Sequence, residues 1–125
     1  MNASSAPPLY IASLLANFFE AGWSIQVLLG DMNRTQFEAS RLARPEIERH
    51  LRTMSDSARA LPAEVRDQMP RVDWQSWEDL GAYVPPHDEH ARSLVWTALE
   101  AWLPPAGAEL RRYRRRLPEL WRFQL

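Results

Sequence analysis

The sequence predicts an all-α fold, an up-down bundle of four or five helices. Apolar residues recur three and four positions apart along several segments, which is the pattern of a helix with one buried face. The chain has no alternating strand pattern and no Asn-Gly pair, so strands and hairpins are not indicated. Its 125 residues suit one domain with one core, and we expect residues 1–125 to fold as a unit.

The first expected helix covers residues 9–29 and follows Pro7 and Pro8, which are typical of a helix start. A segment of this length can span a membrane. Its polar residues, however, lie four, three and four positions apart on one face, and they are Ser13, Asn17, Glu20 and Ser24. No basic segment precedes them, as a signal peptide would have. We therefore expect a soluble, cytoplasmic protein without membrane contact, whose first helix lies centrally or meets a partner.

Two helical segments are expected next, a short capped turn at residues 35–38 and a longer helix over residues 45–61. The inward side of the longer helix is formed by Ile47, Leu51, Met54, Ala58 and Leu61. Its arginines alternate with acids on the outer side, where a pair such as Glu48 and Arg52 contributes only about 0.3 kcal/mol. Pro62 ends this helix and opens a further short turn.

Asp73 is a suitable N-cap for a helix over residues 74–84, and the prolines at 85 and 86 end that helix because neither can donate a backbone hydrogen bond. The next helix begins at residue 88 or 89. Its buried side is formed by Ala91, Leu94, Val95, Ala98, Leu99 and Trp102. Trp96 lies off that side and is expected to mark an interface. The residues Pro104, Pro105 and Gly107 are expected to kink or interrupt the helix before a final segment that reaches about residue 120.

The net charge of −1 conceals an uneven distribution. Residues 109–122 hold six arginines and two glutamates, a local charge of +4, whereas nine arginines and fourteen acids elsewhere give −5. Five arginines stand close together, namely Arg111, Arg112, Arg114, Arg115 and Arg116. With Tyr113 and Trp121 between them, they can follow an RNA backbone and stack bases. The pattern favours the alternative, a solvated helix face or a patch that docks an acidic partner.

The chain lacks cysteine and lysine, which excludes disulfides, thiolate catalysis and lysine Schiff bases. It also has no glycine-rich phosphate loop, nucleophile elbow or HExxH motif, so no cofactor is expected.

Three segments carry a resemblance to a known family. They read Arg49-His-Leu-Arg-Thr-Met-Ser-Asp56 with Leu-Pro following, then Met69-Pro-Arg-Val-Asp-Trp74, then Gly81-Ala-Tyr-Val-Pro-Pro-His-Asp-Glu-His90. Their order resembles the HepT-like family of the HEPN superfamily, which are all-helical bacterial ribonuclease toxins. Family members carry arginine-asparagine, a few residues, then histidine, any residue and tyrosine. Here Gly81 and Ala82 stand in the first two positions and His87 in the third, while Asp88 and Glu89 stand where the tyrosine is sought.

This resemblance implies a HEPN-like fold with a degenerate motif, in which His87, and His90 one turn on, are the remaining catalytic candidates. In the family, two protomers form a metal-independent cleft where histidine transfers a proton and arginine holds the scissile phosphate. The cognate antitoxin is an MNT-type nucleotidyltransferase that adds AMP to the motif tyrosine. We therefore expect a catalytically degenerate homodimeric partner of such an enzyme. The alternatives are an active endoribonuclease that uses His87 and an arginine from elsewhere, or an RNA-binding module built on the C-terminal arginines.

Two further patterns are weaker. Arg44 and His50 have the arginine-to-histidine spacing of a HEPN motif but on another helix, and Arg49 near them is expected to be structural or to line a cleft. The cluster of His87, Asp88 and His90 resembles a metal site, yet helical histidine pairs that bind metals favour a spacing of four rather than three. A helix cap is the simpler interpretation, and no metal is expected.

Overall fold

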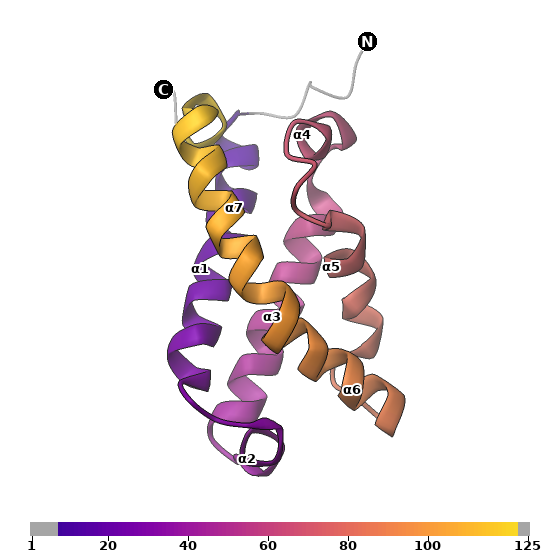
Figure 1. Cartoon of the computed structure of the whole chain (residues 1–125). Helices are drawn as coiled ribbons and strands as arrows, with labels where there is room; N and C mark the ends of the chain where they lie inside the picture. The colour runs from indigo at the N-terminus through magenta and orange to yellow at the C-terminus, as the bar shows by residue number, and fades with distance from the viewer. Residues whose placement is uncertain (1–7, 123–125) are drawn as a thin grey trace.

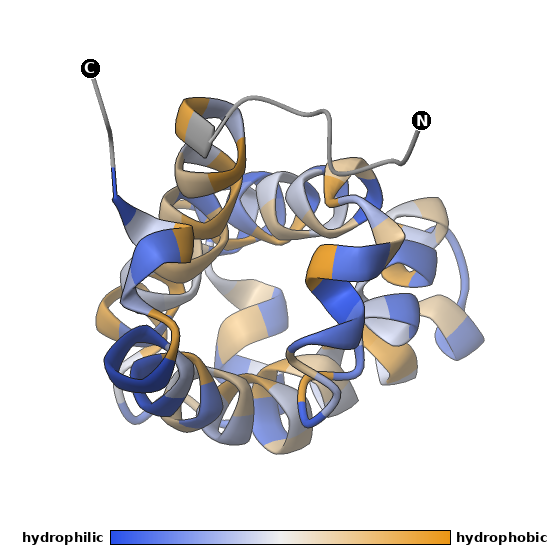
Figure 2. Cartoon of the chain, turned by 90° about the horizontal axis from the view of Figure 1, so that it is seen from above, coloured by the Kyte–Doolittle hydropathy of each residue, from blue (hydrophilic) through white to orange (hydrophobic). Residues whose placement is uncertain are grey.

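A computed structural model describes residues 8–122, and within them every regular element is helical (Figure 1). The predicted all-α bundle is therefore confirmed. The longest elements are α1 (Pro8–Leu29) and α3 (Ala43–Ala60), which share the most extensive contact of any two elements. The remaining α-helices are α2 (Arg34–Ala39), α4 (Ala63–Asp67), α5 (Trp74–Leu80), α6 (Glu89–Thr97) and α7 (Leu103–Arg116). Seen from above, the helices surround a common interior, and each carries both hydrophilic and hydrophobic turns (Figure 2).

Helix α1 packs on the bundle with one apolar face. Its buried side chains include Leu15, Phe18 and Ile25, which face the core, whereas Trp23 and Val27 are 59% and 65% exposed. By length and composition the segment Leu9–Leu29 is sufficient to cross a membrane, a property that the core helix of a soluble protein can share. The expectation that this helix contacts the core or a partner is confirmed for the core, and its other face stays exposed.

Three of the helices, α2, α5 and α6, begin after a polar residue whose side chain caps the helix backbone. Asn33 accepts a hydrogen bond from the Gln36 backbone N–H, and the Gln36 side chain accepts one from the Asn33 N–H, so the cap of α2 is Asn33. Asp73 caps α5 and Asp88 caps α6, as predicted. Helix α3 begins at Ala43 rather than at Pro45, since a proline within the first turn lacks only an N–H that has no intrahelical partner.

The prolines at 104 and 105 do not interrupt the helix, contrary to one of the two expected outcomes. Helix α6 continues through a π-helical turn (Ala98–Trp102) into α7, and the Leu103 N–H reaches back to the Ala98 carbonyl. Both prolines stand in the first turn of α7 directly after this wider turn, which lets the helix continue despite their missing N–H groups. Helix α7 ends at Arg116 rather than near residue 120, and a 3-10 turn (Pro118–Trp121) follows.

Four aromatic rings pack against one another, three of them buried in the core and Trp102 half-buried beside it, and we call Phe18, Trp74, Trp77 and Trp102 the aromatic cluster. The Phe18 ring lies 5.0 Å from Trp74 and 5.7 Å from Trp77, and Trp77 lies 5.8 Å from Trp102 in an edge-to-face arrangement. The Trp74 indole N–H donates to the Met69 carbonyl at 3.0 Å, which satisfies its buried polar atom. The cluster thus joins α1, α5 and the π-turn.

Trp96, expected at an interface, is partly covered within the monomer. It is half-buried against the core, and its ring centroid is 6.0 Å from that of Phe37 in α2. The short helix α2 therefore covers part of the side of α6 that the helical pattern alone leaves open, and the interface stays a prediction.

Replacing Trp77 by alanine tests the aromatic cluster. Because Trp77 is 2% exposed and meets rings on two sides, Trp77→Ala is expected to lower the free energy of unfolding by about 3–5 kcal/mol. The exposed Trp23 is the matched control, and Trp23→Ala is expected to change it by less than about 0.5 kcal/mol. Urea denaturation followed by far-ultraviolet circular dichroism measures both, and equal losses would contradict this account of the core.

Candidate functional site

The histidine segment follows α5 and opens α6. A 3-10 turn (Gly81–Tyr83) continues α5, the Val84–Pro85 peptide bond is cis, and the Asp88 carboxylate accepts the Ala91 N–H at 2.8 Å. His87 and His90 are both exposed, and neither imidazole has a hydrogen bond or ion pair with another described residue. The His90 ring meets the edge of Tyr83, with centroids 5.9 Å apart. The two candidate residues therefore lie at an open helix start and not in a formed cleft.

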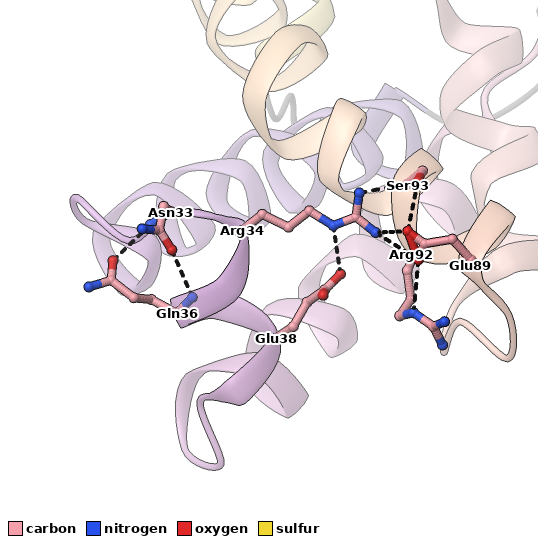
Figure 3. A network of polar contacts seen from close by, with 7 residues as sticks. All are labelled: Asn33, Arg34, Gln36, Glu38, Glu89, Arg92 and Ser93. Atoms are coloured by element: carbon pink, nitrogen blue, oxygen red, sulfur yellow. Dashed lines mark hydrogen bonds and ion pairs between the residues drawn. The ribbon is translucent and has the colours of Figure 1, made fainter.

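A polar network links α2 to this helix start (Figure 3). The Arg34 guanidinium donates to the carboxylates of Glu38 and Glu89, and to the Ser93 hydroxyl at 3.2 Å. Arg92 adds a contact with Glu89 at 3.4 Å between Nε and Oε2. The hydrogen bond from Arg34 lowers the pKa of the Glu89 carboxyl, and the same acids raise the pKa of Arg34. Arg34 and Arg92, near the histidines, are thus each paired with a carboxylate, whereas Arg44 lines a pocket with Arg92 and Pro86.

Gly81, in the position of the family's arginine, lies in close contact with α3. A Cβ added at Gly81 would stand 2.3 Å from the Ser55 Oγ, and the buried Ser55 hydroxyl donates to the Glu78 carbonyl at 2.8 Å. The backbone of Gly81 is right-handed helical, so no unusual φ requires glycine. The close approach to α3 favours glycine instead, because a Cβ here overlaps the Ser55 hydroxyl unless that side chain or the 3-10 turn shifts.

One arginine that the sequence patterns did not single out lies beside Gly81. The Arg59 Nη2 is 3.5 Å from the position that a Gly81 Cβ would take and 3.4 Å from the Glu78 carbonyl oxygen. Arg59 also meets Asp56 and the Glu78 carboxylate, which Arg66 contacts from the next helix at 3.4 Å. The periodic pattern placed Arg59 on the outer side of α3 and carried no signal that this side faces α5.

The pairing of Arg44 with His50 suggested by their spacing does not occur. Arg44 contacts Glu48 at 3.4 Å, and Glu48 is only 8% exposed, so it is not the outer-surface partner of Arg52 that the alternating charges suggested. Arg49 is exposed and holds Glu46 at 2.9 Å on the same helix. Its guanidinium lies 3.4 Å from the His50 Nε2, and burial together with this positive charge lowers the pKa of His50.

No three histidine, aspartate or glutamate side chains within residues 8–122 gather as metal ligands do. His87, Asp88 and His90 are instead residues of a helix start, where Asp88 caps the backbone.

The basic segment is exposed, but one of its two aromatic residues is not. The five arginines lie on the outer face of α7, and Arg112 pairs with Glu109 at 2.7 Å. The others form no ion pair with a described acid. Tyr113 is buried, and its hydroxyl accepts the Arg71 N–H at 3.0 Å, so the predicted stacking role of this ring was wrong. Trp121 is half-buried against the core.

Comparison with models of protein families, with curated proteins and with solved structures gives no match to this chain.

Two glycine substitutions test the close approach at Gly81. Gly81→Ala is expected to lower the free energy of unfolding by about 1–3 kcal/mol, because the added methyl overlaps the Ser55 hydroxyl. Gly107→Ala is the control, since its Cβ would meet nothing closer than 3.9 Å, and a gain of about 0.5–1 kcal/mol is expected from helix propensity. Chemical denaturation measures both. A loss at Gly81 that does not diminish in a Ser55→Ala background would contradict this assignment.

A pH titration of Glu89 tests its contact with Arg34 in the network of Figure 3. Because the folded pKa of Glu89 is lowered, its contact with Arg34 stabilises the fold above the ordinary glutamate range and is lost as pH falls through the folded pKa. Arg34→Gln is expected to return the pKa of Glu89 toward its ordinary range and to leave that of Glu46, lowered by Arg49, unchanged. Carboxyl carbon shifts in an NMR titration measure both acids, and an unmoved Glu89 titration would exclude the contact.

Proposed function

We propose that this chain is a catalytically degenerate HepT-like protein, a homodimeric binding partner of an MNT-type nucleotidyltransferase in a bacterial, cytoplasmic toxin–antitoxin system. The order of the three motif segments and the all-α bundle support the family part of the proposal. The proposed loss of catalysis rests mainly on Gly81. The buried Ser55 hydroxyl occupies the space that a side chain at this position would take. A larger side chain at that position requires the Ser55 side chain or α3 to shift.

The surroundings of His87 support the same conclusion. A phosphate clamp stabilises the charge of the transition state, and its removal typically costs a few kcal/mol of barrier. Beside His87 stand the acids Asp88 and Glu89, and the nearest polar network already pairs Arg34 and Arg92 with carboxylates. Control by AMP transfer to a motif tyrosine is not part of the proposal, because Tyr83 precedes the histidine and packs on His90.

A second candidate is an active endoribonuclease in which Arg59 supplies the clamp. It is favoured by one observation, the Arg59 guanidinium beside Gly81. Its contacts with Glu78 and Asp56 oppose this role, because a guanidinium that two carboxylates neutralise holds phosphate weakly.

Cleavage of single-stranded RNA by highly purified protein, in EDTA, separates the two candidates. The wild-type protein is expected to cleave no faster than His87→Ala or Arg59→Gln. A wild-type activity that His87→Ala abolishes while circular dichroism shows an intact fold would overturn the proposed loss of catalysis. Loss in Arg59→Gln as well would identify the replacement clamp.

Co-expression with the cognate nucleotidyltransferase tests the binding part of the proposal. The two proteins are expected to co-purify, and His87→Ala is expected to keep the complex because catalysis is not what holds it. Sedimentation velocity gives the oligomeric state of the chain alone. If the chain is a monomer and binds no such enzyme, both the homodimer and the proposed partner are contradicted.

A further inference from the structure

An apolar slot opens between α1 and α7 on the side of the bundle away from the histidine segment. The space in and around it is about 300 Å³ with open solvent included, its cavity volume is only about 20 Å³, and it reaches inward to Met54 of α3. Its rim consists of Phe19, Trp23, Gln26, Gly107 and Arg111. Helices α1 and α7 lie side by side here (Figure 1).

The slot exists because small residues face each other across the two helices. A Cβ on Gly22 would lie 3.3 Å from Leu103 and 3.5 Å from Met54, so Gly22 is used for close helix packing. A Cβ on Gly107 would lie 3.9 Å from Arg111 and meet nothing nearer, so Gly107 faces open space. A glycine within a helix makes the fold less stable than an alanine does. No close packing contact at Gly107 requires a glycine there.

The rim combines exposed apolar surface with positive charge. Trp23 is 59% exposed and Val27, one turn further along α1, is 65% exposed. Exposed tryptophan and arginine next to a pocket are the residue types that dominate binding energy at protein interfaces. Arg111 lines the slot and Arg115 follows one turn further along α7, and neither pairs with a described acid.

We infer that this slot is a docking site for an acidic segment of a partner protein, with one apolar side chain of that segment packed against its mouth between α1 and α7. Carboxylates beside that side chain would meet Arg111 and Arg115, which carry the complementary charge. The inference deepens the proposed function by locating a partner surface, but it holds for any acidic partner and does not require a nucleotidyltransferase.

The lining favours a protein segment over RNA. Apart from Gln26 and Arg111 at the rim, the slot is lined by carbon-rich side chains and glycines. A nucleobase placed there would leave polar edge groups without partners, which is costly, whereas a leucine side chain has none to satisfy. Tyr113, the aromatic residue among the arginines, is buried and gives no stacking surface.

A labelled peptide tests the docking site directly. The probe is a fluorescein-labelled acidic helical peptide with a single leucine flanked by glutamates, and its partner probe carries serine in place of leucine. Fluorescence anisotropy is expected to show binding of the leucine peptide about tenfold tighter than of the serine peptide. Gly107→Leu, which fills the slot from its open side, is expected to abolish that difference, and Arg111→Glu is expected to weaken both peptides. Arg41→Glu, at an exposed arginine outside the slot, is the matched charge control.

Several results would overturn the inference. Equal binding of the two peptides would show that only charge attracts them to this surface. Unchanged peptide binding by Gly107→Leu would show that the peptide leucine binds outside the slot. Tighter binding of a single-stranded RNA, sensitive to the same variants, would assign the slot to nucleic acid. Dissociation of a dimer by Trp23→Ala in sedimentation velocity, without any peptide binding, would assign the slot to a second copy. Because none of these measurements involves a nucleotidyltransferase, their failure is distinguishable from a failure of the proposed function.

Discussion

Burial of Trp77 against Phe18 and Trp102 is the contact on which the other features of this bundle depend. The aromatic cluster joins α1, α5 and the π-turn, and therefore fixes where α5 ends and how the joined helix α6–α7 crosses the bundle. The approach of Gly81 to Ser55 follows directly after α5. Gly81 and the exposed histidine segment lie on the chain that leaves this cluster.

Charge is distributed so that the two ends of the joined helix differ. At the start of α6, Arg34 and Arg92 are held by Glu38 and Glu89, and the histidines stand among acids. At the end of α7, arginines lie exposed, and only Arg112 pairs with a described acid. Cations near a helix C-terminus also stabilise the helix through its dipole, so a structural role accounts for part of the basic segment. The slot beside Arg111 is the basis of the binding role that we propose for that segment.

The proposed function relies on binding rather than on cleavage. Hydrolysis of RNA without a metal needs a proton-transferring group and a positive clamp at one point. Here His87 is exposed among acids, and Arg59, beside Gly81, is engaged by Glu78. The exposed Trp23 and the slot between α1 and α7 need no such convergence, because a docking site requires only apolar surface, shape and complementary charge.

The sequence by itself determined the helices and their inward faces, because periodicity and capping are local: Asp73 and Asp88 cap helices as their positions indicate. It also gave the basic segment. Only the tertiary structure decided that Gly81 fits against Ser55, that Glu48 and Trp96 are covered, and that Tyr113 is buried while Trp23 is not. Each of these depends on which helix faces which, and a helical period fixes the apolar side of a helix without naming its neighbour.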